Sequence, residues 1–145
     1  MTMLQWEQHT LIAEDALKKN DFMNSILHYQ QALAISDELQ QSQALSLDDK
    51  LTVSIYSCHN MAKLWRSIGD QEFELKYLQL ASEKVLMLVP QCQNRECDSF
   101  IDSLGCCKKA LIEYMKRHPN PAIASVVQNI ETASNCNLIK RFKLN

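Results

Sequence analysis

Glycine and proline are scarce in this sequence. The chain of 145 residues contains two glycines and three prolines. Sheet folds use many such residues in their turns, because turns need backbone conformations that glycine and proline favour. Their scarcity therefore predicts few turns and long elements. Alanine, leucine, glutamine, lysine and glutamate, which lose little side-chain freedom in a helix, are abundant instead, so we expect an all-α fold.

The sequence also lacks a strong net charge and a long apolar run. The formal net charge is −2, so the protein lacks the broad electrostatic attraction for nucleic acid that a dedicated nucleic-acid binder carries. A regulator that binds nucleic acid through Lys140, Arg141 and Lys143 is therefore the weakest alternative. No run approaches the roughly 18 apolar residues that cross a bilayer, and the start of the chain lacks the basic and apolar regions of a signal peptide. We expect one cytoplasmic domain, residues 1–145, without membrane or nucleic-acid partners.

The six cysteines do not form a recognisable metal-binding pattern. Zinc sites usually space their ligands as two C-x₂₋₄-C pairs, whereas here Cys92 and Cys97 fit only at the upper limit of this spacing and Cys106 and Cys107 are adjacent. We therefore expect no metal and no cofactor. A reversible disulfide between Cys92 and Cys97 stays open, because both lie in or near a loop. We expect three other thiols to act as small core residues, namely Cys58, Cys107 and Cys136.

Apolar residues recur at helical spacing between three strong turn signals. Asn20-Asp21, Gly69-Asp70 and the segment 118–121 each combine a helix terminator with a capping residue. These turns recur at an interval of about 49 residues, and such regularity is typical of helical repeat arrays. The pattern predicts six helices in three antiparallel hairpins, over about residues 4–40, 49–89 and 95–137.

The first two hairpins resemble the tetratricopeptide repeat (TPR) family. In the first, Ser25, Tyr29 and Ala32 occupy the small, aromatic and alanine positions of the family's second helix. The second hairpin matches the pattern in order at Met61, Ala62, Trp65, Gly69, Asp70, Leu78 and Ala81. The third matches in topology alone, and the family's repeat of about 34 residues is shorter than the interval here. The resemblance implies a short right-handed TPR-like α-solenoid, and the chain resembles a small uncharacterised bacterial family of this type.

The resemblance also implies a binding groove lined by the first helix of each hairpin. Its candidate residues are Thr10, Glu14, Lys18, His59, Asn60, Lys63, Arg66, Lys109, Lys116 and Arg117. The later hairpins would give this groove a basic wall, which favours an acidic peptide through charge-assisted hydrogen bonds. The alternative is that these charges form an ordinary solvated helix face. The family's carboxylate clamp is not reproduced, because Thr10 and Glu14 replace its expected basic and amide residues.

The sequence offers no catalytic constellation. Its four histidines lie on separate elements, and it contains no nucleophile elbow, phosphate-binding loop or zinc-protease motif. We expect surface or capping roles for these histidines and no enzymatic activity. The predicted function is a scaffold that binds a peptide or helix of another protein. The alternative is a self-associating structural or regulatory protein, a homodimer paired through the apolar residues Ile123, Val126, Val127 and Ile130.

Overall fold

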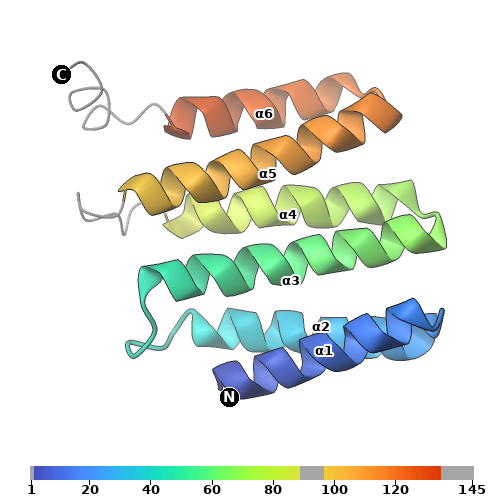
Figure 1. Ribbon diagram of the computed structural model, residues 1–145. Coiled ribbons are helices and arrows are strands. Elements are labelled where there is room, and N and C mark those ends of the chain that lie inside the picture. Colours follow the sequence, from blue (N-terminus) through green and yellow to red (C-terminus); the bar gives the residue numbers. More distant parts are fainter. Residues whose placement is uncertain (1, 89–96, 135–145) are drawn as a thin grey trace. The chain divides into compact units, whose positions relative to one another are not determined.

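The computed structural model describes residues 2–88 and 97–134, and within these ranges the chain is helical and contains no strand (Figure 1). The described residues form six helices: α1 (Met3–Lys18), α2 (Phe22–Leu39), α3 (Leu47–Ile68), α4 (Gln71–Leu88), α5 (Cys97–Arg117) and α6 (Pro121–Ser134). The all-α fold and its consecutive helical pairs are confirmed. The predicted helix boundaries differ from these bounds by a few residues at most.

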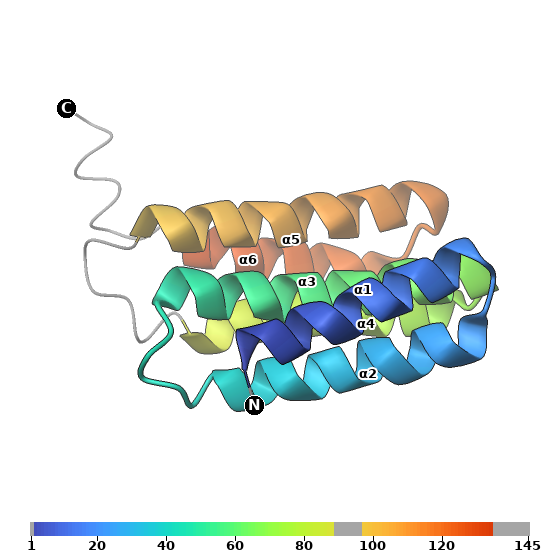
Figure 2. The ribbon, with the colours of Figure 1, turned by 60° about the horizontal axis from the view of Figure 1, so that its bottom comes forward.

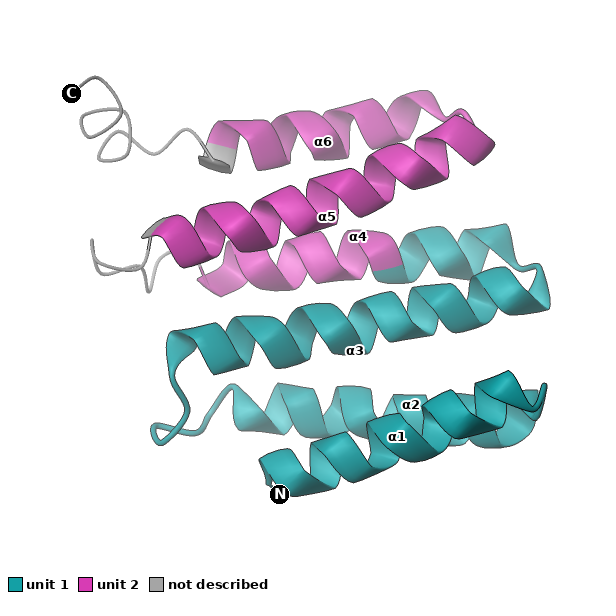
Figure 3. Cartoon of the chain, viewed as in Figure 1, with its two compact units in different colours: residues 1–77 teal, residues 78–145 magenta. Residues whose placement is uncertain are grey.

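The chain forms two compact units (Figure 3). The first, Met1–Tyr77, contains α1, α2, α3 and the start of α4, and the second, Leu78–Asn145, contains the rest of α4 with α5 and α6. The boundary falls within α4 rather than between hairpins.

The first two hairpin turns use the terminators and caps that the sequence predicts. Asn20, with φ of 58°, and Gly69, with φ of 94°, both adopt the left-handed conformation. Asparagine and glycine tolerate this conformation best, because the one has a short polar side chain and the other has none. Asp21 then accepts a hydrogen bond from the Asn24 amide at 3.3 Å. Asp70 accepts one from the Phe73 amide at 3.1 Å, so each aspartate satisfies an otherwise unpaired donor at a helix start.

The starts of α3 and α6 are capped in a similar manner. Ser46 accepts a hydrogen bond from the Asp49 amide at 3.1 Å and so begins α3. Asn120 accepts one from the Ala122 amide at 3.0 Å, with Pro121 as the first helical residue. Proline suits this position, because its missing N–H would have no partner inside the helix. The predicted cap of α6 is therefore confirmed.

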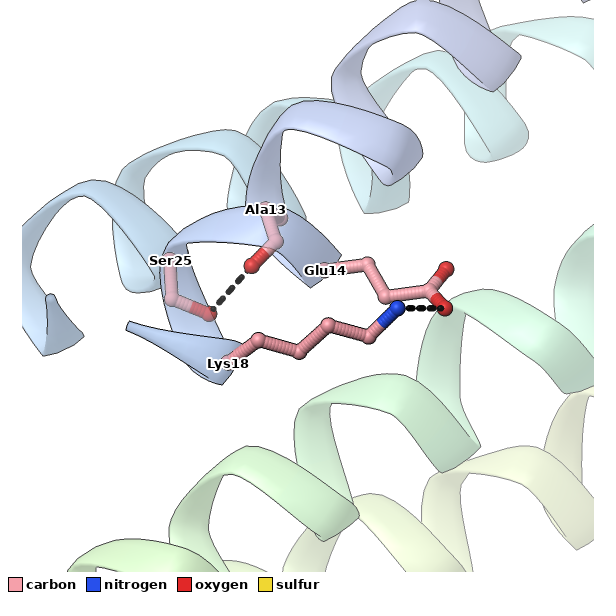
Figure 4. Close-up of polar contacts among 4 residues, drawn as sticks. All are labelled: Ala13, Glu14, Lys18 and Ser25. Carbon is pink, nitrogen blue, oxygen red and sulfur yellow. Dashed lines mark hydrogen bonds and ion pairs between the residues drawn. The ribbon is translucent and has the colours of Figure 1, made fainter. Parts of the chain in front are cut away.

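Close packing in the first unit depends on small residues between α1 and α2. Ala13 is fully buried, and the Ser25 hydroxyl donates a hydrogen bond to the Ala13 carbonyl oxygen at 3.0 Å (Figure 4). Tyr29, Met61 and Leu64 pack with Ala13 in one apolar cluster, which joins α1, α2 and α3. The burial of each large apolar side chain stabilises the fold by roughly 1.5–3 kcal/mol. Ala13 and Tyr29 therefore both pack in the core between these helices.

Helix α3 is attached to α2 along its first half and to α4 near its end. Gln40 Nε2, just after α2, donates to the Lys50 carbonyl oxygen at 3.3 Å and to Ser54 Oγ at 2.9 Å. At the other end, the rings of Trp65 and Phe73 stack with their centroids 4.7 Å apart. Because consecutive helices are antiparallel, α1 and α3 run in the same direction (Figures 1 and 2).

In the second unit α5 and α6 pack as an antiparallel pair. Both helices contribute fully buried apolar side chains, among them Leu111 on α5 and Ile123 on α6. An ion pair between Lys108 Nζ and Glu131 Oε1, 2.8 Å apart, also joins these two helices. Cys107 is fully buried, and so is Cys58 in the first unit, so both are confirmed as core residues. Cys92 and Cys136 lie outside the described residues.

Candidate functional site

A cavity of about 510 Å³ lies on the first unit between α1 and α3, with α2 beneath it. This volume falls within the range of about 300–1,000 Å³ that is typical of binding pockets. The cavity is lined by Trp6, Glu7, Thr10, Leu11 and Glu14 of α1, Tyr29 of α2, and Thr52, Tyr56, Asn60 and Lys63 of α3. These ten residues are called the α1–α3 groove below.

The deepest part of the α1–α3 groove is aromatic and rigidly held. Trp6 and Tyr29 are 8% and 2% exposed. The indole Nε1 of Trp6 donates a hydrogen bond to the buried Ser57 hydroxyl at 2.8 Å, which fixes the ring between α1 and α3. Burial, together with the negative charge of Glu14, raises the pKa of Tyr29 to about 12. The Tyr29 phenol is therefore neutral at physiological pH and can donate or accept a hydrogen bond.

The upper edge of the groove exposes large apolar side chains. Leu11 on α1 is 65% exposed and Tyr56 on α3 is 58% exposed. They lie on opposite walls above an already apolar floor. A tyrosine in such a position offers a large contact area at a low cost in conformational entropy. This combination favours contact with an apolar or aromatic group of a partner molecule.

Charged side chains stand at both ends of the groove. Glu7 and Glu14 are two helical turns apart on α1, about 10 Å along the axis. Glu14 forms an exposed ion pair with Lys18 at 3.7 Å (Figure 4). Among the described residues, neither Glu7 nor Lys63 has an ion-pair partner. Because α1 and α3 are parallel, Glu7 lies toward the start of both helices and Lys63 toward their ends.

Four of the ten groove residues predicted from the sequence are brought together in this cavity. Thr10 and Glu14 lie on its α1 wall, and Asn60 and Lys63 on its α3 wall. The Thr10 hydroxyl already donates a hydrogen bond to the Trp6 carbonyl oxygen at 2.8 Å, so it offers a partner only its acceptor capacity and methyl group. Lys18 lies just outside the lining and is held by Glu14.

The other two predicted residues of the first unit are not part of the lining. Arg66 is exposed in the last turn of α3. His59 is largely buried, its Nε2 has no hydrogen-bond partner among the described residues, and burial lowers its pKa. His59 lies outside the lining because its neighbour Asn60 takes the groove side of α3, and successive helical residues point about 100° apart.

The remaining three predicted residues belong to α5 in the second unit. Lys109 is exposed, Lys116 pairs with Glu113 at 3.5 Å, and the Arg117 guanidinium lies 5.6 Å from the centre of the Tyr114 ring. The groove of the first unit is itself not basic, since it carries two carboxylates and one ammonium group. Its charges therefore suit a partner with charges of both signs.

Sequence reasoning missed most of the groove's apolar lining. Trp6, Leu11 and Tyr56 were absent from the predicted site, although Trp6 precedes Thr10 by one helical turn and Tyr56 precedes Asn60 by one turn. That spacing places each pair on one helix face and could have indicated them. Tyr29 was read as a core residue alone, because a buried aromatic residue usually is one.

The apolar residues of α6 are only partly available for self-association. Ile123 and Ile130 are fully buried, and Val126 and Val127 are half-buried. Two of the four residues predicted to join two copies are thus already covered.

Among the described residues, no group of three or more histidine, cysteine, aspartate or glutamate side chains could hold a metal ion. No described helix combines the length and apolar character needed to cross a membrane.

The fold and the groove together define a small protein of helical hairpins with a preformed cavity between parallel helices. The chain belongs to the DUF2753 family, described as proteins of unknown function, whose pattern matches residues 4–145. It is 59% identical over 141 residues to the uncharacterized protein VP2110 of Vibrio parahaemolyticus serotype O3:K6 (strain RIMD 2210633), covering 97% of this chain and 98% of that protein. No solved structure shows significant similarity to the chain.

Proposed function

We propose that this protein is a non-enzymatic, TPR-like interaction scaffold that holds a peptide or helix of another protein in the α1–α3 groove. The observation that carries the proposal is the cavity of about 510 Å³, with buried Trp6 and Tyr29 beneath exposed Leu11 and Tyr56. A rigid aromatic floor with apolar edges is typical of the anchor pockets that dominate binding energy at protein interfaces. The cytoplasm, expected from the sequence, stays the predicted location.

The length and charges of the groove define the segment that it would hold. About 10 Å separates Glu7 from Glu14, which corresponds to two turns of a bound helix or about three residues of an extended peptide. A basic group of the partner would lie near Glu7, an apolar or aromatic side chain over Trp6, and an acidic group near Lys63. Charge pairs at such partly exposed sites mainly set orientation and specificity, whereas the apolar anchor supplies most of the affinity.

Selection from a displayed library of random 12-residue peptides tests this proposal. Peptides enriched on the full chain are then measured by fluorescence anisotropy against variants of exposed residues. Leu11→Ser and Tyr56→Ser should each weaken binding at least about tenfold, the loss expected for a good apolar contact. Leu27→Ser on α2 is the matched control, because Leu27 is also exposed, at 48%, but does not line the groove.

Two results would contradict the proposal. Enriched peptides whose affinity is the same for the wild type, Leu11→Ser and Tyr56→Ser would bind elsewhere. A library that yields no enriched peptide on the full chain would also count against a peptide groove. If the groove is correct, Glu7→Lys should shift the selected sequences away from a basic residue at one end, whereas Lys63→Glu should remove the preference for an acidic residue at the other.

A further inference from the structure

A basic and apolar segment of the sequence has no part in the proposed function so far. Residues 138–144, which lie outside the described residues, have the sequence LIKRFKL. Lys140, Arg141 and Lys143 make this segment basic, and residues 135–145 contain no aspartate or glutamate, although the whole chain carries a formal net charge of −2. Such an asymmetry of charge favours contact between the segment and an acidic surface.

The α1 wall of the α1–α3 groove is such a surface. Among the described residues Glu7 has no ion-pair partner, and Glu14 pairs with Lys18 at 3.7 Å with 46% of its own side chain exposed. An exposed pair of this kind contributes little stability, so Glu14 can exchange its partner at low cost. Glu7 and Glu14 are seven residues apart on one helix face, about 10 Å along its axis. The wall therefore offers two sites for cationic groups beside an apolar floor.

From this match we infer that residues 138–144 of one copy of the chain bind in the α1–α3 groove of a second copy. The inference rests on the proposed function, because it uses the same groove. In the polyproline II conformation, which has three residues per turn and a rise of about 3.1 Å, Lys140 and Lys143 lie on one side of the segment about 9 Å apart. That spacing is close to the distance between Glu7 and Glu14 along α1, so each lysine meets one carboxylate.

The apolar residues of the segment repeat at the same interval. Ile139 and Phe142 are also three residues apart, so they share a second side of the same polyproline II segment. With the lysines against α1, this side faces the floor of the groove, and Phe142 covers Trp6 between the exposed side chains of Leu11 and Tyr56. Aromatic-lined grooves are well suited to polyproline II segments, because the preformed conformation loses little entropy on binding. Phe142 is therefore the expected anchor.

The contact has a defined symmetry and one unmatched charge. A groove of one copy that binds a segment of another forms a heterologous contact, so reciprocal exchange closes a dimer and exchange in one direction extends to larger assemblies. Lys63, on the α3 wall, has no acidic counterpart in residues 138–144. Lys63→Glu should therefore strengthen the association, by about threefold at low salt, whereas most changes in a binding groove weaken it.

Sedimentation velocity of the full chain, between about 5 and 500 µM, tests the inference, because this range covers weak contacts. A phosphine reductant prevents disulfide-linked dimers through the exposed Cys106. The wild type should associate as its concentration rises, and Tyr56→Ser and Phe142→Ser should each weaken the association at least about tenfold. Leu27→Ser is the matched control, because Leu27 is exposed but does not line the groove.

A mixture of the two defective variants separates a loss of contact from a loss of folding. Tyr56→Ser retains the intact segment, and Phe142→Ser retains the intact groove. An equimolar mixture should therefore associate although neither variant does so alone, and this regain requires both to be folded. In the wild type, an increase from about 50 to 500 mM sodium chloride should weaken the association, since exposed charge pairs are screened by salt.

Three results would overturn the inference: a wild type that stays monomeric at the highest concentration, a mixture that does not associate, or association that persists in both single variants. The last would place the contact elsewhere, for example at the half-buried Val126 and Val127 of α6. If library peptides still bind the groove of a monomeric wild type, the proposed function stands and only the binding of the protein's own segment fails. If the wild type neither associates nor binds any library peptide, both fail.

Discussion

The hydrogen bond between Trp6 and Ser57 connects α1 to α3 across the floor of the groove, and its removal should destabilise the first unit. The bond is 2.8 Å long, and Trp6 and Ser57 are only 8% and 2% exposed. In Trp6→Phe the ring no longer has an N–H donor, and the Ser57 hydroxyl loses its buried partner. A net loss of about 1 kcal/mol is expected for such a bond.

The smaller ring adds a second contribution. Phenylalanine buries less apolar surface than tryptophan, which costs about a further 1 kcal/mol at about 25 cal/mol per Å². We therefore expect Trp6→Phe to lower the free energy of unfolding by about 2 kcal/mol, a large fraction of the roughly 5–15 kcal/mol that stabilises an ordinary domain. Ser57→Ala, which removes the acceptor and leaves the indole N–H buried, should lower it by about 1–2 kcal/mol.

A double-mutant cycle separates the hydrogen bond from the packing change. Urea unfolding, followed by far-ultraviolet circular dichroism at 222 nm, gives the free energy of unfolding for the wild type, both single variants and the double variant. Because both single variants remove the same bond, the double variant should be about 1 kcal/mol more stable than the sum of their effects predicts. Effects that add to within about 0.3 kcal/mol would show that this bond does not couple α1 to α3.

Two further predictions concern the first hairpin. Asn20→Ala should lower the free energy of unfolding by about 1 kcal/mol, whereas Asn20→Gly should change it little, since residue 20 has φ of 58° and alanine is strained there. Equal urea midpoints for these two variants would contradict this. Tyr29, whose pKa is raised to about 12 from 10.0, should contribute stability that is fully present below pH 10. That contribution should be lost between pH 10 and 12, because the unfolded chain releases the phenolic proton first. Urea midpoints measured between pH 8 and 12 should therefore fall less steeply for Tyr29→Phe than for the wild type, and identical slopes would exclude the proposed contribution.

The helices were predictable because their signals are local. Asp21, Asp70 and Asn120 each cap a helix through a backbone amide two or three residues further along the chain. Gly69 and Asn20 end helices through their own backbone angles. Such features depend on a few neighbouring residues, so one sequence is enough to recognise them.

The groove was only partly predictable, because its walls come from helices that are distant in the sequence. Thr10 and Asn60 could be placed by their resemblance to first-helix positions, but Trp6 and Tyr29 resemble ordinary core residues in any apolar pattern. Whether a buried aromatic residue lies beneath a cavity or within a closed core depends on the separation of α1 and α3. Trp6 sets part of that separation through its bond to Ser57, 51 residues away.

The sequence by itself determined the helices, their caps and their pairing into antiparallel hairpins, because these follow from local backbone preferences and from apolar stripes that must be buried. Tertiary structure alone decided which side chains meet. It placed Glu7 and Lys63 at opposite ends of one cavity, left His59 half-buried outside the groove lining while its neighbour Asn60 lines it, and brought His9 within 2.9 Å of His28. The physical reason is that these contacts depend on helix separation and rotation, which the packing of the whole unit sets.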